Sequence, residues 1–180
     1  MRGPGFQYAK DMDGTTKVPA LLYVIGKNSV TFTIGDLVRI NTSGFCDIAD
    51  ANTEAIAGVV SQIVDKNGKS VDADSGTLHD YTMNSANQTS ASYQYKIGFI
   101  PALPNYLFYN DTSGDLTRTM MFQYFYLTSE SQVDGTSGTD THVEQFRLIE
   151  RDPDHDADAS KGLFQIVQSQ FAQEAEDVVA

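Results

Sequence analysis

Two stretches decide the fold: Gly35-Asp36-Leu37-Val38-Arg39-Ile40 and, further along the chain, Ala55-Ile56-Ala57-Gly58-Val59-Val60. The first opens on a Gly-Asp turn and alternates out of it, as a short strand does. The second carries small and β-branched residues around Gly58, and a glycine in a strand lets another backbone come close. The apolar side chains of both stretches suit a barrel wall and not an active site. We therefore predict that they form two strands of a small barrel.

Composition extends this prediction to the whole chain. It has 180 residues, enough for one domain or two small ones, and 41% of them are apolar. Ten Phe and nine Tyr fall mostly in short runs of β-forming residues between frequent turns. Residues 30–34 and 93–100 alternate as half-buried strands do, and Asn67-Gly68 is typical of a hairpin turn. The polar stretch 71–92 is predicted to be a long exposed loop.

The predicted fold class is all-β: a small antiparallel β-barrel or sandwich followed by an antiparallel β-meander, with an extended N-terminal arm. The arm is glycine-rich and covers residues 1–16. A β-barrel domain is expected over 17–110, and the meander, in the same or a second small domain, over 116–171. Residues 172–180 are expected to be an acidic tail. An arm of this kind is either a flexible tail or a contact with a neighbouring subunit, and we favour the contact.

An aromatic run marks the start of the meander. Residues 119–128 are apolar on both faces, so the predicted strand is buried on both sides or lies in an interface. As core, its aromatic stripe would fill the meander; as an interface, it would anchor a neighbour, because aromatic residues dominate binding hot spots. The residues that we select as interface candidates are Phe6, Tyr8, Phe122, Tyr124 and Tyr126.

The charge balance limits the partners. The chain has 24 acidic and 12 basic residues, for a net charge of −12. Such a charge repels nucleic-acid backbones and anionic membranes, so we expect neither as a partner. No apolar run approaches the ~18 residues of a membrane span.

One acidic loop could hold a metal ion. Aspartates alternate through 152–160, and carboxylates in that pattern can wrap a hard cation such as Ca²⁺. The spacing departs from an EF-hand, because Ala157 replaces the turn glycine and Leu163 replaces the bidentate glutamate. A solvated hairpin loop explains the same pattern, so we assign no metal site and keep as candidates Asp152, Asp154, Asp156 and Asp158.

The sequence predicts neither an enzyme nor a cofactor. Cys46 is the only cysteine and is expected to be a small buried hydrophobic residue. The three histidines lack metal-ligand spacing, and no nucleophile elbow or phosphate-binding loop is present. Asp72, Asp74 and Asp80 share one loop, which is a poor platform for a fixed pair of carboxylates.

The spacing "G-D-L-V-x-I … A-I-A-G-V-V" resembles the capsid decoration, or cement, proteins of tailed phages, over roughly residues 15–100. The resemblance implies a structural protein that bridges neighbouring capsid subunits and stabilises the assembled shell. It implies the major capsid protein as partner and a homo-oligomer, with a trimer favoured. The expected location is the outer capsid surface of the virion, after synthesis in the host cytoplasm. The alternative is a head-fibre or adhesin-like module that binds a glycan of the host surface through its long loops.

Overall fold

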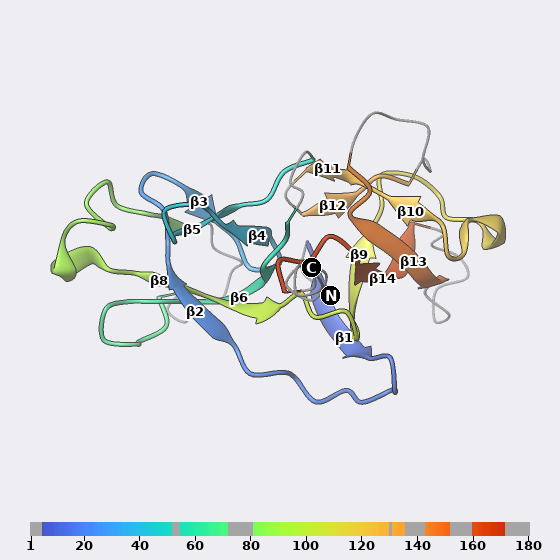
Figure 1. Cartoon of the computed structure of the whole chain (residues 1–180), viewed down its shortest axis with the longest axis horizontal. Coiled ribbons are helices and arrows are strands. Elements are labelled where there is room, and N and C mark those ends of the chain that lie inside the picture. Colours follow the sequence, from blue (N-terminus) through green and yellow to red (C-terminus); the bar gives the residue numbers. More distant parts are fainter. Residues whose placement is uncertain are drawn as a thin grey trace, which may run out of the picture.

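The protein is all-β, as predicted. The structure, a computed structural model, describes residues 5–51, 55–71, 81–129, 131–135, 143–151 and 160–171. Antiparallel sheets make up this part of the chain, and its helical segments are the short 3-10 helices η1 (Ala91–Tyr93) and η2 (Arg118–Met120). Within these segments no helix has the length and apolar character needed to cross a membrane. Figure 1 shows two five-stranded sheets that lie beside each other along the long axis.

The first sheet, here called the barrel sheet, contains both of the deciding stretches. Its strands, in spatial order, are β2 (Leu22–Ile25), β8 (Lys96–Pro101), β6 (Gly58–Val64), β4 (Leu37–Ile40) and β5 (Cys46–Ile48). β4 and β6 pair directly, with Leu37 opposite Val59. The sheet curls until its two edges meet at one end, where the Lys27 amide donates to the Cys46 carbonyl at 2.9 Å. The predicted barrel strands are therefore present and adjacent.

Gly58 allows a neighbouring backbone to come close, as its place in the sequence predicted. A Cβ atom there would lie 2.1 Å from the carbonyl oxygen of Ile100, on the neighbouring strand β8. The predicted hairpin at Asn67-Gly68 also forms, since the amide of Asp65 donates to the carbonyl of Lys69 at 2.9 Å.

The loop predicted over 71–92 is not an exposed loop throughout. Its described part contains β7 (Tyr81–Thr82), which pairs with β3 (Thr31–Phe32). Met83 and Asn87 are buried. The Asn87 side chain donates to the Gly26 carbonyl at 2.5 Å and accepts from the Tyr95 amide at 2.7 Å. Paired backbone and a buried amide therefore hold this segment on the barrel; residues 72–80 lie outside the described residues.

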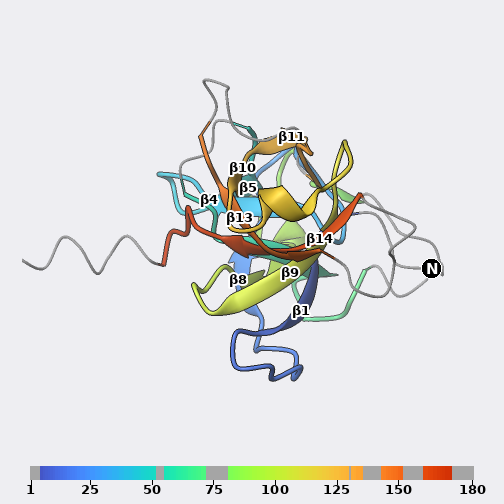
Figure 2. The ribbon, with the colours of Figure 1, turned by 90° about the vertical axis from the view of Figure 1, so that its right-hand side faces the viewer.

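The second sheet contains the predicted meander. Its order is β1 (Gln7–Asp11), β9 (Tyr106–Asp111), β14 (Lys161–Ile166), β13 (Phe146–Arg151) and β10 (Tyr124–Phe125), seen in Figure 2. The last three strands are consecutive antiparallel neighbours, as the similar aromatic segments predicted. A small hairpin of β11 (Leu127–Ser129) and β12 (Gln132–Val133) lies beside the sheet.

The arm and the domain boundaries differ from the prediction. Strand β1 comes from the arm and pairs with β9 of the same chain, with Tyr8 opposite Phe108. β9 in turn falls within the expected barrel domain but belongs to the second sheet. The described part of the arm therefore completes the chain's own sheet through the edge of β9, and its contact with a neighbouring subunit stays a prediction.

One hydrophobic core joins the two sheets. Its buried side chains come from the arm, the barrel sheet and the second sheet: Phe6, Leu37, Ile56, Val59, Ile100, Phe108, Phe125, Phe146, Leu148 and Phe164. A second cluster fills the barrel itself: Phe32, Val38, Ala57, Val60, Ile63, Ile97 and Phe99. The barrel and the meander thus pack as one body.

The chain after β14 crosses back to the barrel sheet. The Ile56 amide donates to the Gln168 carbonyl at 2.7 Å, and the Gln170 amide donates to the Ile56 carbonyl at 3.0 Å. The Gln170 side chain accepts from the Ile40 amide at 2.9 Å and donates to the Ile40 carbonyl at 3.0 Å. The side-chain amide of Gln170 thus forms with the Ile40 backbone the two hydrogen bonds that a neighbouring strand would form. Residues 172–180, the expected acidic tail, lie outside the described residues.

Candidate functional site

The aromatic run of the meander is divided, and part of it faces solvent. Instead of one strand over 119–128, the chain forms η2, a turn, β10 and β11. Phe125 and Leu127 point into the core and are buried, whereas Phe122 is 56% exposed and Tyr124 is 42% exposed. Tyr126 is partly buried. The structure therefore favours the interface hypothesis over the core hypothesis for Phe122 and Tyr124.

Arg147 completes this surface. It lies directly opposite Tyr124 in the pairing of β13 with β10. Its guanidinium carbon is 5.4 Å from the ring centroid of Phe122 and 6.0 Å from that of Tyr124. Both distances are in the range of cation–π contacts. We call Phe122, Tyr124 and Arg147 the aromatic–arginine surface. The alternation of β13 marks Arg147 as facing outward, but it does not tell which rings the side chain meets.

The backbone at Phe122 is unusual. Its φ angle is 65°, a left-handed conformation that side-chain-bearing residues rarely adopt. The amide of Phe122 donates to the carbonyl of Leu148 at 2.8 Å, and the amide of Leu148 donates to the carbonyl of Gln123 at 3.1 Å. These two bonds to β13 fix the turn and hold the phenyl ring out over the sheet.

The two aromatic candidates of the arm are held by their own chain. Phe6 is 2% exposed and its ring stacks on Phe146 at 5.1 Å, so its side chain lies in the core of this chain. Tyr8 packs edge-on against Tyr106 and Phe108, and its hydroxyl donates to the Asp11 carboxylate. Burial, followed by that hydrogen bond, raises the pKa of Tyr8. The sequence of a short aromatic arm does not reveal whether the arm packs on a sheet of its own chain or on another chain.

The remaining candidates from the sequence are the aspartates of the acidic loop and Cys46. The aspartates of the acidic loop, Asp152 to Asp158, lie outside the described residues. Within the part of the chain that the structure describes, no group of three His, Cys, Asp or Glu side chains could hold a metal ion. Cys46 is fully buried, as expected, and burial raises the pKa of its thiol. A protonated, buried thiol is a poor nucleophile.

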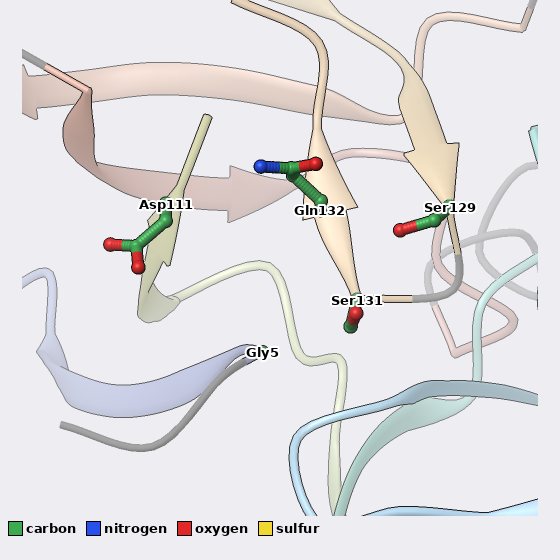
Figure 3. A pocket seen from close by; sticks show the side chains of 5 residues that line it. All are labelled: Gly5, Asp111, Ser129, Ser131 and Gln132. Carbon is green, nitrogen blue, oxygen red and sulfur yellow. The ribbon is translucent and has the colours of Figure 1, made fainter. Parts of the chain in front are cut away.

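A small polar pocket lies where the chain leaves β9. Its volume is about 240 Å³, and Figure 3 shows the residues that line it: Gly5, Asp111, Ser129, Ser131 and Gln132. The Asn110 side chain ties the tip of the β11–β12 hairpin to β9, because it donates to the Ser131 carbonyl at 2.8 Å and accepts from the Val133 amide at 3.0 Å. The carboxylate of Asp111 at the end of β9, with two hydroxyls and an amide on the hairpin, can hydrogen-bond a hydroxylated ligand. The sequence analysis missed this pocket because its residues are ordinary turn residues from separate segments.

The described residues thus provide an exposed contact surface and a polar pocket on a rigid β body. Both are features of binding more than of covalent chemistry. Comparison with known proteins identifies no relative: no family model, no curated protein and no solved structure matches the chain.

Proposed function

We propose that this chain is a structural virion protein that decorates the assembled capsid shell and stabilises it by bridging neighbouring capsid subunits. The observation that carries the proposal is the place of the two stretches that resemble decoration proteins. They form the paired strands β4 and β6, with Leu37 opposite Val59 and Val38 opposite Gly58, in a small barrel. Most of their apolar side chains are buried in the core, which fits a protein that works by shape and contact.

The mechanism is passive. A subunit that binds the assembled lattice and not free capsid protein stabilises the lattice by mass action, with no chemical step. Such a subunit needs a rigid body and an exposed attachment surface. The shared core of the two sheets fits the first requirement, and exposed side chains of the second sheet are compatible with the second. We propose the major capsid protein as the partner and the outer capsid surface as the location, with the protein itself a homo-oligomer.

The test compares shells with and without the protein. Shells assembled in its absence are mixed with the purified protein, sedimented and analysed for bound subunits, and their thermal disruption is followed by light scattering. We expect saturable binding and a higher disruption temperature. Shells that bind no protein, or that melt at the same temperature when decorated, would contradict the proposal.

The polar pocket favours a second candidate, a module that binds a glycan of the host surface. Asp111, Ser129, Ser131 and Gln132 offer hydrogen bonds of the kind that sugar hydroxyls use. In that case the protein binds polysaccharide from the host envelope, and Asp111→Asn weakens this binding while the fold stays intact. Equal binding by the variant, or no polysaccharide binding at all, would exclude this function for the pocket.

A further inference from the structure

Arg147 has an unusual environment for an arginine side chain. Its guanidinium lies near two exposed rings, Phe122 and Tyr124. Among the described residues, the structure gives this side chain no carboxylate and no hydrogen-bond acceptor, and its Nε atom is buried without a partner. Buried polar groups are otherwise almost always paired, so an unpaired one calls for an explanation.

Arg39 provides the comparison within the same chain. Its Nε atom is also buried without a partner, but its terminal nitrogen lies 3.8 Å from the carboxylate of Asp47, which in turn accepts from Lys27 at 2.6 Å. Arg39 therefore has a carboxylate nearby, which it shares with Lys27. For Arg147, no carboxylate lies at a comparable distance among the described residues.

The backbone at Phe122 supports the same conclusion. A left-handed φ of 65° is unfavourable for phenylalanine, and here it displays the ring in solvent and not in the core. Strain of this kind persists where the surrounding structure imposes it, and it is concentrated at functional sites. The two hydrogen bonds to β13 hold this backbone in place and leave the phenyl ring exposed beside a guanidinium that has no carboxylate among the described residues.

The chemistry of the missing partner follows from the guanidinium. Rings near the guanidinium displace water from it, and its N–H groups lie in one plane in a fork that matches the two oxygens of a carboxylate. Tyrosine and arginine are also enriched among the residues that dominate protein interfaces. A nucleic-acid phosphate is disfavoured as the partner because the chain carries a net charge of −12.

We infer that the aromatic–arginine surface is the attachment point to the shell, where Arg147 pairs with an aspartate or glutamate carboxylate of the capsid protein and the rings of Phe122 and Tyr124 cover apolar side chains around it. This inference rests on the proposed function, and it names the surface and the partner chemistry that the proposed function leaves open. The three residues act together, since the rings exclude water from the ion pair.

The test measures binding to shells assembled without the protein, for three variants and two controls. Arg147→Lys keeps the charge but loses the planar fork, and Arg147→Gln loses both. Phe122→Gly removes the ring and also relieves the left-handed backbone. Each is expected to weaken binding about tenfold or more, with a melting temperature of the free protein that is unchanged or, for Phe122→Gly, not lowered. The controls Arg39→Lys and Tyr93→Ala change an arginine that is already paired and an exposed tyrosine on η1, and they should bind as the unchanged protein does.

A second measurement identifies the acceptor. Shells whose surface carboxylates have been amidated with carbodiimide and ethanolamine should lose affinity for the unchanged protein. They should lose much less for Arg147→Gln, which no longer has the group that reads a carboxylate. An equal loss for both proteins would show that Arg147 does not bind a carboxylate.

The outcomes separate the two proposals. If the unchanged protein does not bind shells, the proposed function is wrong. If it binds shells and the Arg147 and Phe122 variants bind equally well, decoration stands and this surface is not the attachment point.

Discussion

Gly58 occupies a point in β6 that no side chain can share. A Cβ atom would meet the Ile100 carbonyl oxygen at 2.1 Å and the Phe99 ring at 2.6 Å. Backbone atoms of a paired strand cannot move aside as the end of a side chain can. Any side chain at Gly58 is therefore expected to disturb the barrel sheet.

Gly58→Ala is expected to lower the free energy of unfolding by about 1–3 kcal/mol or more, because overpacking forces β6 and β8 apart. Urea denaturation followed by circular dichroism measures the change. Gly114→Ala is the matched control, since its Cβ would meet its nearest neighbour at an ordinary 3.7 Å. Equal losses in both variants would show that the close approach is not the cause.

Ionisation of Tyr81 at alkaline pH is expected to lower the stability of the fold. Its ring lies 5.1 Å from that of Tyr95. Burial, followed by a hydrogen bond with Tyr95, raises the pKa of Tyr81 from 10.0 to about 12. The fold therefore favours the neutral phenol. Its contribution to stability is fully present below pH 10 and is lost as the pH rises from 10 towards 12, because the unfolded chain ionises first.

A spectrophotometric titration at alkaline pH checks this expectation. Tyr81→Phe should remove absorbance that appears near pH 12 and leave the earlier phenolate signal unchanged. The stability of the variant should also fall less steeply between pH 10 and 12. A difference spectrum that develops with a midpoint of 10 would mean that Tyr81 titrates as a free phenol.

Strand β1 turns the glycine-rich arm into part of the core. Phe6→Ala removes a ring that stacks on Phe146 and is expected to lower the free energy of unfolding by about 3–5 kcal/mol.

Deletion of residues 1–11 removes β1 as well and leaves one edge of β9 unpaired, so we expect a chain that aggregates. Expression yield and thermal melting measure both effects. Met12→Ala, at an exposed position just after β1, should melt close to the unchanged protein.

Local sequence patterns predicted where strands form better than they predicted which strands pair. Alternation located β4, β8 and the meander strands β13 and β14, because apolar periodicity depends on the residues of the strand itself. The pairing of Tyr8 with Phe108 could not be predicted, since nothing near either residue encodes a neighbour so far away in the sequence. Asn87 was missed for a similar reason: its burial depends on Gly26 and Tyr95, which lie outside its own segment.

The candidate site was predicted in part. An aromatic stripe at Phe122 and Tyr124 was visible as an alternation, but core and interface give the same pattern. The left-handed backbone that turns Phe122 outward depends on two hydrogen bonds to β13. Helix and strand propensities do not predict a left-handed backbone at a phenylalanine. Arg147 was missed because its significance comes from what surrounds it.

The whole molecule should unfold in one step. The core that includes Phe6, Ile56, Ile100, Phe125 and Phe164 joins the two sheets, so each sheet exposes part of its buried apolar surface without the other. Scanning calorimetry is expected to show a single transition whose calorimetric and van't Hoff enthalpies agree. The isolated segment 17–110, which lacks four of the five strands of the second sheet, is expected to stay unfolded. Two resolved transitions, or a folded fragment, would show two independent domains.

The position of β1 at the edge of the second sheet has a consequence during synthesis. β1 leaves the ribosome before its partner β9, which follows about a hundred positions later, and β9 in turn pairs with β14, further along the chain. At ordinary elongation speeds β1 waits for roughly 5–20 s. Ribosomes that follow one another on a message hold many such strands close together. A β1 that meets the β9 of a neighbouring nascent chain makes the same hydrogen bonds as in its own fold, so we expect crowded translation to raise the fraction of strand-exchanged chains.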